Sequence, residues 1–460
     1  MDDRDKLPSE PDDDGDGDYN LPDFSGMDFS GMADQMRQFM DPDGNLDVNK
    51  LMNGLRAALG QAMSGSDPAS GLNWNATAES VTRLVAARGD DPVPDRIPSD
   101  LADSFGLANR WLDEATTFSG DTLRLELWNR TRWVQQTMSA WRSMCGPIVV
   151  SLGAALIAMA SDNLQEGAPP ELSSLAELLT PMMRSTAGEF YATRLSKVIA
   201  DLAATTLTGT DAALPMVKPP TVALLPSNIT EFTKGLTAPS TDTIVYLLAR
   251  ECARQRLFAA TPWLGPQILA LIEHYAREIT IDPSALREGF DVETLSEMTP
   301  QRLAEISSKM EDKIFRPATT DEQKQILARL ETLICLVEGW VDTVVGQAAD
   351  PWLTSVSALA ETMQRRRAAQ GPAERALSNL VGIQLSSRRV RDAANLWAAV
   401  GHDRGVAARD ALWGHPDLLP QTGDLDDVLG FVAKTGADAE PDAMDAQLNW
   451  LVDQWRKDNE

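Results

Sequence analysis

The stretch at residues 243–263, TIVYLLARECARQRLFAATPW, constrains the fold of this chain more than any other. Its apolar residues recur at helical spacing, as Ile244, Leu247, Leu248 and Phe258 show. A proline cannot continue a helix, so Pro262 marks its end. The pattern predicts a buried helix that stops before Pro262.

Inside this stretch lies the run Arg250-Glu251-Cys252-Ala253-Arg254. With His at its first and last positions, the run would read H-E-x-x-H, a zinc-protease helix. Positions i and i+4 share one helix face, so two imidazoles there hold one metal ion while the Glu polarises its water. Arginine has no lone pair to offer a cation. The sequence therefore predicts the catalytic helix without its metal chemistry.

The net charge of the chain limits the kinds of partner that it can bind. The chain has 460 residues and a formal net charge of -27. Binding to phosphates or to anionic lipid needs clustered Lys and Arg, so we expect no nucleic-acid partner and no membrane. Residues 1–18 are Asp-rich and lack the pattern of a secretory signal. We expect a soluble, cytoplasmic protein.

Residues 1–70 differ from the rest because Asp, Gly, Ser and Pro dominate them. We interpret this segment as a disordered acidic tail with short amphipathic, Met-rich segments. Leu51, Leu55, Leu59 and Met63 form one helical stripe there. The alternative is a docking segment whose stripe enters the groove of a partner protein, and protein partners are expected through this tail.

The tail also contains the run DDDGDG at residues 12–17, with Asp23 at the position of the last ligand in a calcium loop. Pro11 and Pro22 flank the run, and no helix pattern precedes it. Low-complexity Asp/Gly sequence is the favoured interpretation.

Beyond the tail, periodic apolar residues predict a mainly α fold with at most a small β element. We expect one helical domain at residues 71–435 and an amphipathic C-terminal helix within 436–460. The expected helices cover residues 77–88, 99–116, 123–144, 147–160, 171–207 (as two helices), 231 onward, 267–279, 321–346, 358–369, 372–380 and 387–400. One strand is expected at residues 221–225, before Pro226.

Several spaced motifs carry a family resemblance. They are Asn73-Trp74, RWLDEAT at 110–116, Trp128 with Arg132 and Trp133, LLPSN at 224–228, RLF at 256–258 with PWL at 262–264, LVEGWVD at 336–342 and LWGHPDLLP at 412–420. Through these motifs, residues 73–432 resemble the actinobacterial zincin-like metallopeptidase family, type 2. The resemblance implies a zincin-like fold, and its members are described as hydrolases or zinc-dependent metalloproteases.

The resemblance also assigns roles to residues. Active members are similar to this chain at the central helix but carry H-E-x-x-H there, and the Glu of an L-x-E-G motif is their third ligand. By this match Glu251 corresponds to the general base and Glu338 to the third ligand. Arg250 and Arg254 replace both His ligands, so we expect no metal cofactor here, although active relatives use zinc.

Other metal ligands are few. The His residues are His274, His402 and His415, and each is expected to be exposed or satisfied by a neighbour. A Cys252/Cys335/Glu338 site is the alternative, but the two arginines would repel a cation there. Free thiols in the core are favoured for these cysteines and for Cys145.

Two hypotheses about function remain open. The first is a zincin-like protein that has lost zinc and catalysis and acts as a binding or scaffold module. The second is an active metal-dependent hydrolase or peptidase with non-standard ligands. Under the first, we expect Arg254, together with Arg250, to pair with Glu338 or Glu251, so that an ion-pair cluster takes the place of the metal.

A basic group stands out against the acidic composition. It comprises Arg365, Arg366, Arg367, Arg388, Arg389 and Arg391. We interpret it as the solvent face of two helices, and the alternative is an anchor for the acidic tail or an acidic partner.

Overall fold

The computed structural model describes residues 65–165, 171–211, 214–279, 320–369 and 387–436, with single positions between 371 and 380. All of them belong to one compact unit, Met63–Gly289 with Lys309–Glu460. The predictions for residues 1–64, for the C-terminal helix at 437–460 and for most of 372–380 lie outside the described residues.

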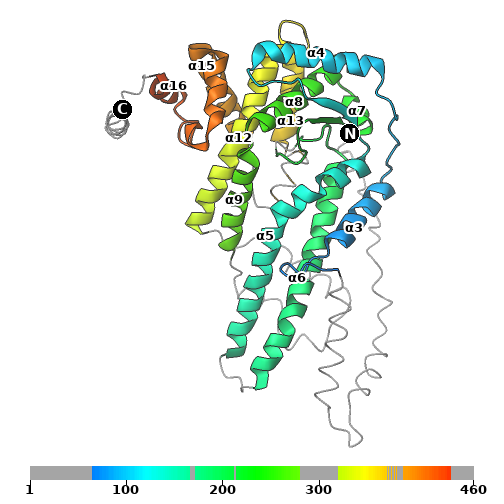
Figure 1. Cartoon of the computed structure of the whole chain (residues 1–460), viewed down its shortest axis with the longest axis vertical. Helices are drawn as coiled ribbons and strands as arrows, with labels where there is room; N and C mark the ends of the chain where they lie inside the picture. The colour runs from blue at the N-terminus through cyan, green and yellow to red at the C-terminus, as the bar shows by residue number, and fades with distance from the viewer. Residues whose placement is uncertain are drawn as a thin grey trace, which may run out of the picture. The chain divides into compact units, whose positions relative to one another are not determined.

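The prediction of a mainly α fold with a small β element is confirmed (Figure 1). Three long helices, α5, α6 and α12, account for much of the chain. The elements are α3 Trp74–Ala87, α4 Ser99–Ala115, β1 Arg124–Leu127, α5 Arg130–Gln165, α6 Glu171–Ala203, β2 Thr221–Leu224, α7 Pro226–Thr233, α8 Ser240–Ala260, α9 Leu264–Arg277, α12 Asp321–Ala349, α13 Val356–Ala368, α15 Ser387–Ala411, the 3-10 turns η3 Leu412–Gly414 and η4 Pro416–Leu418, and α16 Val428–Gly436.

The sheet has two parallel strands, with Arg124 opposite Thr221 and Leu127 opposite Leu224. Strand β2 agrees with the prediction, but the prediction of a helix from residue 123 was wrong. Leu125 and Leu127 are buried while Arg124 is exposed and Glu126 half-buried, which is the period of a strand. Helix α5 begins only after Asn129, whose Oδ1 accepts a hydrogen bond from the amide of Arg132.

Helices α5 and α6 run side by side (Figure 1). Each is continuous where the sequence predicted a break: α5 passes through Pro147, and residues 171–203 form one helix. Met144, Cys145, Ile148 and Val149 are buried on both sides of this proline. Their burial outweighs the roughly 3 kcal/mol that an interior proline costs. None of the described helices, α5 included, has the length and apolarity needed to cross a membrane.

Helix α8 lies in the core and ends at Ala260, before Pro262 as predicted. It contacts α4, α12, α13 and β2, and every residue from Val245 to Phe258 is buried. Such a helix must satisfy its polar side chains inside the protein, because no face of it reaches water. Helix α12 lies beside it and starts with a capping box between Thr320 and Gln323.

Replacing Gly339 by Ala is expected to destabilise the contact of α12 with α15. A Cβ at this position would lie 2.7 Å from Ala393 Cβ and 2.7 Å from the amide nitrogen of Ala394. Such overpacking costs about 1–3 kcal/mol, measurable as a lower free energy of unfolding in urea. Gly346→Ala on the same helix is the control, since its Cβ meets no atom within 4 Å. Equal stability of the two variants would contradict this close contact.

Candidate functional site

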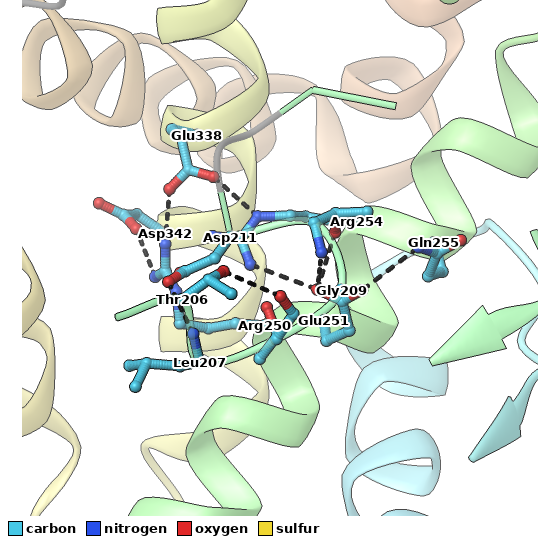
Figure 2. Close-up of polar contacts among 12 residues, drawn as sticks. Thr206, Leu207, Gly209, Asp211, Arg250, Glu251, Arg254, Gln255, Glu338 and Asp342 are labelled. Atoms are coloured by element: carbon cyan, nitrogen blue, oxygen red, sulfur yellow. Dashed lines mark hydrogen bonds and ion pairs between the residues drawn. The ribbon is translucent and has the colours of Figure 1, made fainter. Parts of the chain in front are cut away.

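Six side chains from three helices form a central cluster at the position where the family resemblance places the metal site. Arg250, Glu251 and Arg254 come from α8, Glu338 and Asp342 from α12, and Arg367 from α13. Residues four apart lie on one helix face, so Arg250 and Arg254 face Glu338 and Asp342 across the helix pair. Figure 2 shows these four side chains pointing toward one another.

Glu338 lies between the two arginines of α8. Arg250 Nη2 donates to Glu338 Oε2 at 2.7 Å, and Arg254 Nε donates to Oε1 at 2.8 Å. Arg250 Nη1 also reaches Asp342 Oδ1 at 2.5 Å. Each arginine side chain is 1% exposed, so these are charge-assisted hydrogen bonds shielded from water.

Arg367 adds a third guanidinium to the cluster. Its Nη1 donates to Glu338 Oε2 at 2.8 Å, and its Nη2 donates to Asp342 Oδ2 at 2.5 Å. Three guanidinium groups therefore face three carboxyl groups, counting Glu251. Isolated ions of either sign are costly to bury, so this balance of charge allows the cluster to lie in the core.

The prediction that the basic group is the solvent face of two helices was wrong for part of it. Arg367 points into the central cluster, and Arg366 Nη1 donates to the buried Asp211 at 2.8 Å. Arg389 pairs with Asp426 at 2.6 Å. The remaining members, Arg365, Arg388 and Arg391, are exposed as predicted.

Glu251, at the general-base position, is fully buried and faces the loop at residues 206–211. Its Oε2 accepts hydrogen bonds from Thr210 Oγ1 at 2.7 Å and from the Thr210 amide at 3.3 Å, while Gln255 Nε2 donates to Oε1 at 3.3 Å. Gly209 in this loop also packs closely against Glu251, because a Cβ added to Gly209 would lie 3.1 Å from Glu251 Oε1. The carboxyl group is thus closed off from solvent in this arrangement.

The two buried glutamates have opposite pKa shifts. Burial raises the pKa of Glu251, and Arg254 and Thr210 only partly offset it. Burial would also raise the pKa of Glu338, but Arg254, Arg250 and Arg367 together hold it well below its ordinary value. Glu338 is therefore a stable anion, and the arginines around it are its counter-ions.

The donor atoms present do not fit a metal ion. At the two positions where the family resemblance expects imidazoles, guanidinium groups occupy the space and offer no lone pair. Glu338 and Asp342 already accept hydrogen bonds from these and from Arg367. Within the described residues, no group of three or more His, Cys, Asp or Glu side chains is placed to hold a metal ion.

The alternative Cys252/Cys335/Glu338 site does not fit a metal either. Both thiols are buried, burial raises the pKa of each, and within the described residues they form no group of three or more His, Cys, Asp or Glu placed to hold a metal ion. Burial likewise raises the pKa of Cys145 to about 12. His274 lies 3.2 Å from Glu322 on the surface, and His415 accepts from the amide of Asp417.

Sequence reasoning missed three members of this region: Asp342, Arg367 and Asp211. Asp342 had a usable signal, because it lies four residues after Glu338 on the same helix, as Arg254 does after Arg250. Arg367 had none, since its neighbours Arg365 and Arg366 look identical in sequence. Asp211 lies in a loop, where sequence spacing does not predict contacts.

Comparison with known proteins identifies the family of this chain. The family model for zincin-like metallopeptidases matches residues 72–432, so the chain belongs to the zincin-like metallopeptidase family. A crystal structure described as a putative hydrolase with a novel fold from Chloroflexus aurantiacus is similar, with a TM-score of 0.52. The likeness covers 80% of this chain and 100% of that chain at 14% identity, which shows a shared fold alone. No curated protein matches the chain.

Proposed function

We propose that this member of the zincin-like metallopeptidase family has lost zinc and peptidase chemistry and acts as a non-catalytic binding or scaffold protein. One observation carries the proposal. Arg250 and Arg254, at the two positions where the family resemblance expects His, both donate hydrogen bonds to Glu338. The residue that matches the third zinc ligand is thereby paired with protein cations.

The electrostatics support this replacement. A zinc ion would supply positive charge next to Glu338, and the guanidinium groups supply it here in permanent form. Charge-assisted contacts, including the bidentate contact of Arg367 with Asp342, fix the spacing of α8, α12 and α13. The family's catalytic helix would then serve as a structural core that holds the surfaces of the protein in place.

The position of Glu251 supports the loss of catalysis. A general base must reach a water or substrate atom within hydrogen-bond distance. Both oxygens of Glu251 are occupied by Thr210 and Gln255, and the side chain is 0% exposed. Proton transfer to a bound substrate would require the loop at residues 206–211 to move away.

The proposal predicts that chelators leave the purified protein unchanged. Incubation with EDTA or 1,10-phenanthroline should not shift its melting temperature, because no metal contributes to folding. Assays with unfolded protein and peptide mixtures should show no hydrolysis, with an active zinc peptidase as the positive control. Chelator-sensitive hydrolysis that Glu251→Gln abolishes would instead establish the alternative, a metal-dependent hydrolase with non-standard ligands.

A further inference from the structure

A second concave site lies apart from the central cluster. We call it the side groove: it has a volume of about 590 Å³ and is bordered by the N-terminal half of α5, residues 214–218 and the start of α9. None of its lining residues belongs to the central cluster. Its volume lies within the range of roughly 300–1,000 Å³ typical of small-molecule sites.

The lining of the side groove is half apolar and half polar, with Gln136 and Ser139 among its polar residues. Met144 from α5, Met216 from the loop and Ile268 from α9 contribute to its apolar half, together with the indole of Trp128. Methionine side chains are flexible and polarisable, so this half adapts to apolar groups of different shape. Such a mixed lining matches a ligand that has one apolar and one polar part.

The rim of the side groove carries an excess of one positive charge. Arg132 Nη2 pairs with Glu126 Oε2 at 2.7 Å, and the same oxygen accepts from Trp128 Nε1 at 2.8 Å. Glu126 is thus already engaged by two donors. Lys218 is exposed and forms no ion pair with any described residue. A local excess of positive charge is notable in a chain of net charge -27.

We propose that the side groove binds a small amphipathic carboxylate, with its apolar body on Met144, Met216 and Ile268. The carboxylate lies against the ammonium group of Lys218, beside the guanidinium of Arg132. A single excess charge matches a monoanion, and the apolar half of the lining would leave a fully polar anion such as phosphate without partners there. The field of Lys218 selects the anion, since the rest of this acidic protein repels it.

The side groove is separate from the loop that covers Glu251, because no residue from 206–211 lines it. Trp133, on the helix that borders the groove, donates from Nε1 to the carbonyl oxygen of Gly209 at 3.2 Å. Residues 214–218 of the groove begin three positions after residue 211, where this loop ends. Since no residue of the central cluster lines the groove, it is a ligand site of its own and does not depend on the loss of zinc.

Titration calorimetry with three eight-carbon probes tests the proposal: octanoate, 1-octanol and octylammonium. Octanoate is expected to bind at one site, 1-octanol at least tenfold more weakly, and octylammonium not at all. Lys218→Met should weaken octanoate binding about tenfold, equivalent to about 1.4 kcal/mol, and leave 1-octanol unchanged. Lys197→Met is the matched control, an exposed lysine on α6 that does not line the groove.

A second variant tests the location independently of charge. Gly265→Leu places an apolar side chain at the groove, where its Cβ would meet Pro215 at an ordinary 3.6 Å. It should abolish octanoate binding without changing the melting temperature. No saturable octanoate binding at millimolar concentration, or equal binding by wild type, Lys218→Met and Gly265→Leu, would overturn the proposal.

Discussion

The Glu338→Gln protein is expected to be less stable than wild type by about 3–5 kcal/mol, the usual cost of breaking a buried ion pair from one side. Glutamine keeps the size of the side chain but removes the charge that balances Arg250, Arg254 and Arg367. These guanidinium groups are nearly inaccessible to water, and among the described residues their remaining direct ion pairs are with Asp342 and Glu251. Equilibrium unfolding in urea measures the effect.

Glu361→Gln is the matched control, because Glu361 on α13 is exposed and pairs only loosely with Arg365 at 3.5 Å. Exposed pairs of this kind contribute roughly 0–1 kcal/mol. A cost for Glu338→Gln as small as that of the control would show that the central cluster does not stabilise the fold.

Glu338 also determines how the stability of the protein should change at acidic pH. The pKa of Glu338 is lower in the folded protein than its ordinary value of 4.5 in an unfolded chain. Its contribution to the free energy of unfolding is therefore complete at pH values above 4.5 and is lost as the pH falls. The free energy of unfolding should therefore decline from about pH 5 downward. Glu338→Gln should flatten this decline, since no carboxyl group remains there to titrate.

Replacing both Arg250 and Arg254 by His should produce a larger loss of stability and, with it, a response to zinc. The double variant removes every hydrogen bond between α8 and α12 in the central cluster, so its melting temperature should fall well below that of wild type. It also restores H-E-x-x-H opposite Glu338. Zinc that binds the folded form raises stability by mass action, by about 2.7 kcal/mol at 100 times Kd.

Zinc should therefore raise the melting temperature of the double variant and leave wild type unchanged. Adding Glu338→Gln to the double variant is the control, because it removes the third ligand that the family resemblance assigns. A zinc response that survives in this triple variant would mean that the metal binds elsewhere. A double variant as stable as wild type would contradict the structural role of the arginines.

The sequence predicted the elements whose burial follows a regular period. The central helix was predictable because its apolar residues recur on several faces and Pro262 marks its end. Strand β1 was not, because four residues next to a Trp-rich helix pattern give too short a signal. Helix α5 was divided wrongly at Pro147, because local propensity does not include the tertiary packing that offsets a proline.

The residues of the candidate site likewise fall into those that the sequence predicted and those that it did not. Arg250, Glu251 and Arg254 lie in one short run, and Glu338 follows from the family resemblance, so the sequence predicted their proximity. The cover over Glu251 comes from Gly209 and Thr210 in a loop, and Arg367 comes from a separate helix. Contacts of this kind depend on tertiary placement and leave no spacing in the sequence.

The metal content of the purified full-length chain tests the central claim most directly. Protein expressed in zinc-supplemented medium, passed over a metal-free column and measured by inductively coupled plasma mass spectrometry should carry far less than one zinc per chain, because guanidinium groups occupy the ligand positions. One zinc per chain, retained in wild type and lost in Glu338→Gln, would contradict the account and establish a metal site built from other ligands.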